Sequence, residues 1–361
     1  MNPLFGRRLS RRRFLIRAAE VGLATGAVGL GIGAILERIP RSPWDPKAFP
    51  PPGRAKVAVL KASSYNGDLE GMVLEGLQAV GVGAEVRGAS VLLKPNMVEF
   101  DPSSVINTDP RLVAATVAAM KRLGARAVTV GEGPGHRRDT QYVVQQSGLR
   151  DLLRDVQTPF VDLNSAALTR VSLRSSWTQL GELWLPTPVV EADVVVSMPK
   201  MKTHHWGGVT LSLKNMFGVV PGRIYGWPKN VLHWAGLQES ILDVAGAVKP
   251  HIAIVDGIVG MQGDGPIKGT SIQAGHLVIG TDPVAVDATA AYLMGVDPTR
   301  VTYLADAARF LGQGDLGKIT QVGEDPTRSV TDFKLRPEFE GLRLGATGGS
   351  HVADPAHAAG G

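Results

Sequence analysis

The sequence predicts an α/β protein, with one or two mostly parallel, Rossmann-like sheets, helices on the sheet faces and a short antiparallel insertion. Two observations lead to this prediction. Apolar runs of strand length alternate with longer stretches of helical pattern, a rhythm typical of parallel strands joined by right-handed crossovers. In addition, 44% of the 361 residues are hydrophobic, which is enough to build a sizeable core.

Each predicted element rests on a local pattern. The strands are short apolar runs rich in β-branched residues. Helix ends are best defined where Asp109 is a good N-cap, Pro110 suits the first helical position and Gly124 is a stop signal. Alternating apolar and polar residues between 168 and 188 predict the antiparallel insertion. Strands are expected at 57–60, 91–93, 127–130, 194–196, 252–255, 277–279 and 319–322, and helices at 68–80, 110–123, 234–248 and, capped by Asp282, 283–294.

The N-terminus has the pattern of an export signal. Ser10-Arg11-Arg12-Arg13-Phe14-Leu15 matches the twin-arginine motif, which a translocation machinery reads as an address. An uncharged run, 21–36, follows, and its 16 residues fall short of the roughly 20 that span a bilayer. No Ala-x-Ala cleavage site follows it directly. Two locations therefore stay open: a periplasmic or otherwise extracytoplasmic protein, and one anchored to the membrane by an uncleaved leader.

Composition divides the chain into five segments and limits its partners. The net charge of +5 comes entirely from the first 40 residues, which hold seven Arg and two acids, so it gives no reason to expect a nucleic-acid partner. The predicted segments are a leader or anchor (1–39), a Pro-rich linker (40–53), a first α/β region (54–190), a second α/β region (191–344) and a disordered Gly/Ala-rich tail (345–361).

Polar segments follow four of the predicted strands, at the point where each strand ends. Because ligands bind beyond the carboxyl ends of strands in open parallel sheets, we expect these segments to form one site. Ammonium groups gathered there would repel one another unless an anion or carboxylates lay between them, which predicts a pocket for a carboxylate or phosphate. The alternative for each lysine alone is a surface position beside an acid. The expected substrate-binding residues are Lys94, Asn96, Lys200, Lys202, Lys214 and Asn215, and the expected catalytic residues are Asp256, Asp264 and His204.

The same segments also hold groups that bind divalent metals. The candidate ligands are Glu132, His136 and His205, and the alternative is that these histidines order turns. Since His204 and His205 are adjacent, they would point to opposite sides of a strand, so only one of them would be an easy ligand. No motif in the sequence indicates another cofactor. It contains no Cys, which excludes disulfides and iron–sulfur clusters held by thiolates.

At these motifs the chain resembles the domain of unknown function 362 family. The resemblance spans residues 57–323 and implies an α/β fold. Many members carry ferredoxin-like cluster modules, which implies redox settings, although this chain has no Cys for that role. The family is also distantly similar to nickel-pincer lactate racemases, which act on small hydroxy acids, and none of their cofactor ligands is placed here. The matching motifs are Leu93-Lys94-Pro95-Asn96, Gly131-Glu132-Gly133-Pro134-Gly135, Ser197-Met198-Pro199-Lys200-Met201-Lys202-Thr203-His204, Leu213-Lys214-Asn215-Met216-Phe217-Gly218, Val255-Asp256-Gly257-Ile258, Gly263-Asp264-Gly265-Pro266 and Thr281-Asp282-Pro283-Val284-Ala285-Val286-Asp287.

Together these features predict an exported enzyme that acts on a small anionic substrate by acid/base chemistry, with a metal assisting if the candidate ligands hold one. The reaction would be of the isomerase or lyase class, or associated with an oxidoreductase. The alternative is a non-catalytic accessory protein that binds a ligand or cofactor for a redox system. The expected partners are the small anion and the twin-arginine translocation machinery. No nucleic acid is expected, and the membrane is contacted only through an uncleaved leader.

Overall fold

The structure, a computed structural model, describes residues 42–135 and 139–346. The chain divides into two units, Met1–Pro43 and Trp44–Gly361, and the fold described below belongs to the second. The predicted leader and all but the first two residues of the predicted tail lie outside the described residues, as does His136. Within the described ranges, no helix is both long and apolar enough to cross a membrane.

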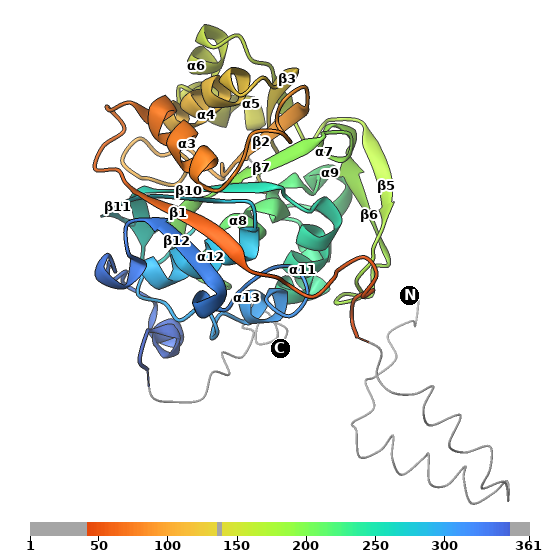
Figure 1. The fold of residues 1–361 in the computed structure, drawn as a ribbon. Helices are drawn as coiled ribbons and strands as arrows, with labels where there is room; N and C mark the ends of the chain where they lie inside the picture. Colours follow the sequence, from red (N-terminus) through yellow and green to blue (C-terminus); the bar gives the residue numbers. More distant parts are fainter. Residues whose placement is uncertain (1–41, 136–138, 347–361) are drawn as a thin grey trace, which may run out of the picture. The chain divides into compact units, whose positions relative to one another are not determined.

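One large sheet organises this unit (Figure 1). Its strand order is β12-β1-β11-β10-β7-β2-β3-β4, with β8 beside β10 and β9 beside β8. Strands from both predicted α/β regions therefore share this sheet. The strands are β1 (Ala55–Lys61), β2 (Ser90–Pro95), β3 (Ala127–Glu132), β4 (Phe160–Asp162), β7 (Val194–Met198), β8 (Lys200–His204), β9 (Gly208–Thr210), β10 (Ile252–Gln262), β11 (Thr270–Gly280) and β12 (Ile319–Gly323).

The centre of the sheet is parallel, as the sequence predicts. β3 and β7 both run parallel to β2, and β10 starts parallel to β7. β11 is antiparallel to both β10 and β1. The pairing of β10 with β11 is antiparallel because the connection between them, residues 263–269, is short. A parallel pairing would need a crossover of a dozen or more residues. The result is a mixed sheet with a parallel core.

Helices cover both faces of the sheet (Figure 1). Alternation along β1 shows why: Val57 and Val59 belong to one hydrophobic core, while Ala58 and Leu60 belong to the other. The core of Ala58 and Leu60 is completed by α3 (Leu69–Ala79), α4 (Pro110–Arg122), α5 (Thr140–Gln146) and α6 (Leu149–Asp155). The core of Val57 and Val59 is completed by α8 (Ser212–Asn215), α11 (Leu237–Val248), α12 (Pro283–Leu293) and α13 (Thr302–Ala307). The short turns are α7 (Thr187–Val190), η1 (Met216–Val219), α9 (Gly222–Tyr225), α10 (Asn230–Trp234), η2 (Leu316–Lys318), η3 (Pro326–Arg328) and η4 (Pro337–Leu342).

The predicted helix signals act as expected. The Asp109 carboxylate accepts a hydrogen bond from the Arg111 backbone N–H, and Pro110 is the first residue of α4. Asp282 caps α12 by accepting from the N–H groups of Val284 and Ala285. These caps fix where the two helices begin.

The predicted antiparallel insertion is confirmed: β5 (Leu168–Ser172) and β6 (Glu182–Pro186) form a separate two-stranded sheet. Between these strands, Trp177 stacks on Trp44, with ring centroids 6.1 Å apart. Trp44 also stacks on Phe310 at 5.0 Å, and Phe49 is buried. Part of the stretch predicted as a linker therefore packs on the body of the protein.

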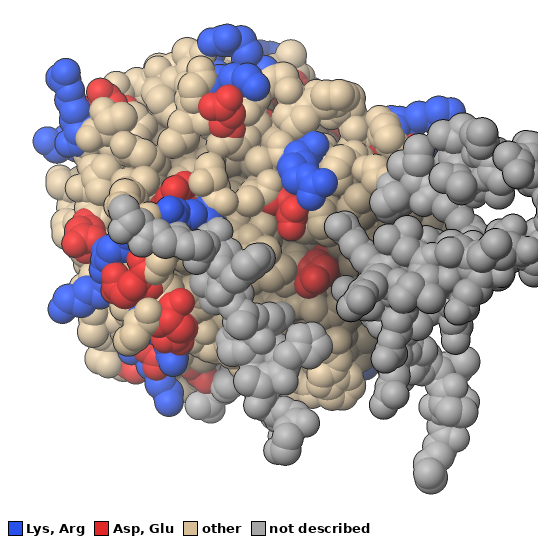
Figure 2. Space-filling view, turned by 90° about the horizontal axis from the view of Figure 1, so that it is seen from below, with Lys and Arg blue, Asp and Glu red and all other residues tan. Residues whose placement is uncertain are grey.

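Charged side chains of both signs are interspersed over the uncovered part of the face in Figure 2. Surface ion pairs such as Arg336–Asp264 contribute little to stability, because water and salt screen them.

Candidate functional site

A cavity of about 260 Å³ lies beyond the carboxyl ends of β2 and β3, with a wall from β8. β2 has β3 on one side and β7 on the other, so the order of the strands reverses here. Such a switch point is where ligands bind in open parallel sheets. Many predicted site residues line the cavity: Lys94, Asn96, Glu132, Lys202, His204, His205, Lys214 and Asn215.

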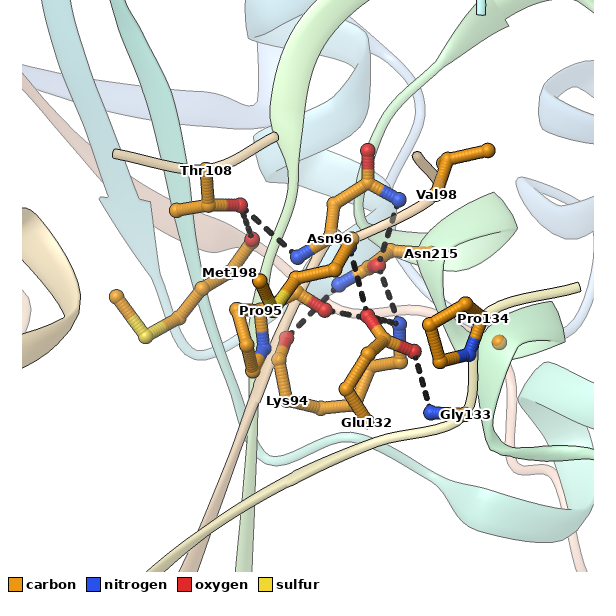
Figure 3. Close-up of polar contacts among 12 residues, drawn as sticks. Lys94, Pro95, Asn96, Val98, Thr108, Glu132, Gly133, Pro134, Met198 and Asn215 are labelled. Atoms are coloured by element: carbon orange, nitrogen blue, oxygen red, sulfur yellow. Dashed lines mark hydrogen bonds and ion pairs between the residues drawn. The ribbon is translucent and has the colours of Figure 1, made fainter. Parts of the chain in front are cut away.

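Two of the residues that line this cavity, Lys94 and Glu132, form a buried ion pair, which Figure 3 shows with its hydrogen bonds. Lys94 Nζ lies 2.7 Å from Glu132 Oε2, and both side chains are about 1% exposed. The ammonium also donates to the Pro95 carbonyl and to Asn215 Oδ1, each at 2.8 Å, so its three hydrogens are all used. Burial lowers the pKa of Lys94, and the Glu132 carboxylate opposes that effect. The sequence predicts that Lys94 binds substrate, but its three hydrogens already have acceptors, so Lys94 is a positioning group.

Glu132 accepts hydrogen bonds at both carboxylate oxygens. Besides Lys94, its Oε2 accepts from the Met97 N–H at 2.8 Å, and its Oε1 accepts from the Gly133 N–H at 2.8 Å. These three donors leave one lone pair of Oε1 unused. Within the described ranges, no group of three or more His, Cys, Asp or Glu side chains is arranged to hold a metal. His136 lies outside them, so metal binding stays a prediction.

Two lysines in the cavity wall have unused N–H groups. Lys202 is fully buried, and its one hydrogen bond within the described ranges is to the Ile106 carbonyl at 2.9 Å. Burial, and then Lys214 and Lys200, lower the pKa of Lys202 well below its usual value. Lys214 is half-buried and makes no hydrogen bond or ion pair to a described residue; its Nζ lies 5.7 Å from the Phe217 ring centroid. Burial and Lys94 lower its pKa to about 8.

A further buried lysine, Lys229, is missed by sequence reasoning. Its Nζ donates to the carbonyls of Gly133 (3.0 Å), Phe217 (3.1 Å) and Gly218 (2.9 Å). Burial lowers its pKa to about 7, but three carbonyl acceptors match the three donors of an ammonium group. Lys229 ties the loop after β3 to η1 and so closes one wall of the cavity. Its only local signal is a Pro-Lys-Asn turn, which does not indicate burial.

The two adjacent histidines have opposite hydrogen-bonding roles. His204 Nδ1 lies 3.0 Å from the Trp206 nitrogen and 3.2 Å from the Gly207 nitrogen, and since backbone N–H groups only donate, Nδ1 must accept. The neutral ring therefore carries its proton on Nε2. His205 Nδ1 lies 2.7 Å from the Gly265 carbonyl oxygen, which only accepts, so this ring carries its proton on Nδ1 and has a lone pair on Nε2.

Both imidazoles line the cavity, although the sequence predicts that they diverge. The prediction assumes strand alternation through both residues, but β8 ends at His204. Their rings stack with centroids 4.8 Å apart. Burial, and then Lys214 and His205, lower the pKa of His204 well below its usual value. His204 is therefore a neutral donor at Nε2, and His205 offers an acceptor.

Lys200 and Asp256 are paired with each other and do not line the cavity. The Lys200 ammonium donates to Asp256 Oδ2 at 2.6 Å, to the Tyr65 hydroxyl at 2.9 Å and to the Val259 carbonyl at 3.1 Å. Both charged side chains are at most 2% exposed. The sequence predicts substrate binding for Lys200 and catalysis for Asp256. The pair has a structural role instead, because every hydrogen of the Lys200 ammonium already has an acceptor.

Asp264 is also placed elsewhere than predicted. Its carboxylate is exposed and pairs with the Arg336 guanidinium at 2.7 Å. Conversely, the cavity wall includes Thr210 and Trp206, which sequence reasoning omitted. Trp206 directly follows the two histidines, so proximity in sequence is the signal that could have found it.

Fold and cavity together define an α/β protein with a lysine-lined cavity at the switch point of its sheet. The model of the family described as Domain of unknown function (DUF362) matches residues 91–292, more than half of the chain, and the chain belongs to this family. The Thylakoid-associated protein sll1697 of Synechocystis sp. is 28% identical over 297 residues, which are 78% of this chain and 88% of that protein.

Two solved structures are similar to part of this chain at low identity. The lactate racemase apoprotein from Thermoanaerobacterium thermosaccharolyticum is 13% identical with a TM-score of 0.40, and the match covers 63% of this chain and 55% of that one. A protein from Thermotoga maritima is 12% identical with a TM-score of 0.38, over 62% of this chain and 57% of that one. The chain thus spans little more than half the length of these two structures.

Proposed function

We propose that this protein is an exported enzyme that acts on a small anionic substrate, a carboxylate or phosphate, by acid/base chemistry. One observation carries the proposal: Lys202 and Lys214 line one cavity, and neither has a carboxylate partner among the described residues. A buried cation without a counter-ion is costly, and charge-assisted hydrogen bonds to an anion would remove that cost. The bound anion would thereby keep both lysines protonated.

The histidines supply the proton chemistry in this proposal. His205 Nε2 has a lone pair and can accept a proton, while His204 Nε2–H can only donate a hydrogen bond unless its tautomer changes. We therefore assign the role of general base to His205 and that of a fixed donor to His204. This differs from the sequence prediction, in which His204, Asp256 and Asp264 carry the chemistry.

The location is proposed from two sources. The sequence has a twin-arginine motif at Arg11 and Arg12. The cyanobacterial relative is named as a thylakoid-associated protein, which agrees with a place outside the cytoplasm or at a membrane. We propose that this chain reaches such a location through its leader.

Calorimetric titration with acetate and with inorganic phosphate tests the anion site. We expect at least one of them to bind wild-type protein and Lys214→Met to weaken that binding by about tenfold or more, since an ion pair is lost while the length of the side chain is kept. Lys318→Met, at an exposed surface pair with Asp315, is the matched control and should bind as wild type does. If neither anion binds, or if Lys214→Met binds normally, the anion site is wrong.

Catalysis needs a separate measurement, because binding alone also fits the non-catalytic alternative. A panel of small carboxylates in D₂O can be followed by proton NMR for exchange at the carbon next to the acid group. An acid/base enzyme that removes this proton should exchange it, and His205→Gln should abolish the exchange while acetate still binds. Binding without exchange across the panel would favour an accessory protein.

A further inference from the structure

One lysine in the cavity wall differs from the others in being both accessible and unbound. Of the four described lysines that line the cavity, Lys94 and Lys229 each donate to three acceptors. Lys202 is fully buried and donates to the Ile106 carbonyl. Lys214 is only half-buried, and its nitrogen makes no hydrogen bond or ion pair to a described residue. It is therefore the amine that a ligand in the cavity can approach.

The fold holds the stem of this side chain while leaving its nitrogen unbound. Helix α8, which carries Lys214, begins where the buried Asp287 carboxylate accepts a hydrogen bond from the Ser212 N–H at 2.7 Å. The methylene groups run past Gly207, where an added Cβ would lie 3.3 Å from Lys214 Cε. The nitrogen itself lies 5.7 Å from the centroid of the Phe217 ring. The amine thus has a defined place between backbone and an aromatic ring.

The surroundings of Lys214 favour the neutral amine, which has a free lone pair. Acceptors and carboxylates stabilise an ammonium group, and the described carboxylate that lines the cavity, that of Glu132, is already paired with Lys94. Burial and the charge of Lys94 lower the pKa of Lys214 to about 8, so half of it is neutral at that pH. Lysines that are desolvated or lie beside other cations are the ones that attack carbonyl carbons.

We infer that Lys214 forms an imine with the ligand of this cavity, and that this ligand is an aldehyde or ketone that also carries an acid group, which pairs with Lys202. This inference rests on the proposed function, since it takes the lysine-lined cavity as the substrate site. It goes further by requiring a carbonyl group on the substrate and a covalent bond to one named nitrogen. An ion pair needs neither.

The reaction releases one molecule of water. The lone pair of Lys214 Nζ attacks the carbonyl carbon, so a C–N bond forms and the π electrons of the carbonyl move to its oxygen. One hydrogen from the nitrogen and one proton from solvent are transferred to that oxygen, which leaves as water when the C–N bond becomes C=N. The imine nitrogen keeps one hydrogen and a positive charge. The acid group of the ligand therefore still faces two cations, as in the proposed anion site.

Reductive trapping tests the inference on wild-type protein. Cyanoborohydride converts an imine into a stable secondary amine, which peptide mass spectrometry locates. With glyoxylate at the pKa of Lys214, we expect Lys214 to be labelled about tenfold or more faster than the exposed Lys318, because an ordinary lysine is almost entirely protonated there. Acetate should compete for Lys202 and so slow the labelling of Lys214 and not that of Lys318.

The outcomes separate this inference from the proposed function. Labelling of Lys214 no faster than that of Lys318 would overturn the imine, and calorimetric binding of acetate would then leave the anion site standing. Fast labelling of Lys214 that acetate does not slow would overturn the place given to the acid group, and the anion site with it.

Lys202→Met tests the pairing of the acid group, with acetaldehyde as the matched probe, because acetaldehyde has a carbonyl and no acid group. With each rate divided by that of Lys318 in the same sample, we expect wild-type Lys214 to prefer glyoxylate over acetaldehyde by about tenfold or more. Lys202→Met should lose this preference and still be labelled by acetaldehyde at Lys214, which shows that the cavity is intact. A preference that survives in Lys202→Met would overturn the pairing with Lys202.

Discussion

At the scale of single residues, the site depends on which atoms are already occupied. Lys94, Lys200 and Lys229 each donate to three acceptors, while Lys202 and Lys214 retain donors within the described ranges. The sequence alone does not distinguish these five lysines. Only the distribution of acceptors around them separates the lysines that hold the fold together from those that can hold a ligand.

The first prediction concerns the tautomers of the adjacent histidines. We expect ¹⁵N NMR to show His204 protonated at Nε2 and His205 protonated at Nδ1, because their Nδ1 atoms face donors and an acceptor respectively. His204 should remain neutral to a lower pH than an ordinary histidine, since burial and Lys214 lower its pKa. Single His204→Gln and His205→Gln variants assign the signals. The same tautomer at both rings would contradict the proposed roles.

At the scale of elements, β8 decides which side chains meet. The strand follows β7 after a single residue, Pro199, and pairs with β10. Alternation places Lys200, Lys202 and His204 on one side and Met201 and Thr203 on the other. From the sequence, a strand is expected only at 194–196, with a polar segment after it. The alternation of Lys-Met-Lys-Thr-His is the signal that would have predicted a strand.

A second prediction concerns η1, which lies against the buried ion pair. A Cβ at Gly218 would contact Lys94 Nζ and come within 2.9 Å of Glu132 Oε1. Gly218→Ala should therefore push the pair apart and lower the free energy of unfolding by about 1–3 kcal/mol, measured by urea denaturation. At Gly67 an added Cβ meets nothing within 4 Å, so Gly67→Ala is the control and should change stability little. Equal stability of the two variants would refute the close packing.

At the scale of the whole molecule, the proposed binding of an anion is coupled to the uptake of a proton. Lys214 has a pKa of about 8 in the free protein. Below that pH the ammonium is already present, and above it anion binding must take up a proton. We therefore expect acetate affinity to fall by about tenfold per pH unit above pH 8, until the pKa of the complex is reached. Calorimetry in buffers of different ionisation enthalpy would detect the proton uptake. Lys214→Met should remove the part of this dependence that begins near pH 8, and a wild-type affinity constant to pH 10 would contradict it.

The fourth prediction concerns the leader, which lies outside the described residues. Replacing Arg11 and Arg12 by Lys should leave folded protein in the cytoplasm, because the address is lost and the rest of the chain is unchanged. Replacing Arg7 and Arg8, which precede the motif, by Lys is the control, because it makes the same chemical change outside the motif and likewise leaves the charge unaltered. Cell fractionation measures the outcome. If the Arg11/Arg12 variant is exported as well as the control, the motif is incidental.

The fold could be predicted from sequence more completely than the site. Strand rhythm and helix caps such as Asp109 and Asp282 are local signals, and they act as expected. Which of Lys200 and Lys202 is neutralised is not a local property of the sequence. Asp256 and Tyr65 approach Lys200 from distant positions, whereas among the described residues Lys202 has a hydrogen bond only to Ile106. Strand-end chemistry predicts that residues such as Lys94, Lys202 and Lys214 come together, and they line one cavity. It could not tell which charges neutralise one another inside it.

The position of β1 has a consequence for synthesis. β1 lies between β11 and β12, so Lys61 is opposite His276 and Val59 is opposite Gly323. Among the described residues β1 is the first strand to be synthesised, and it lacks both neighbours until almost all later strands have been made. Such long-range pairing slows folding. A chain that stops before β11 leaves β1 without either neighbour, so a prematurely ended product cannot complete the sheet.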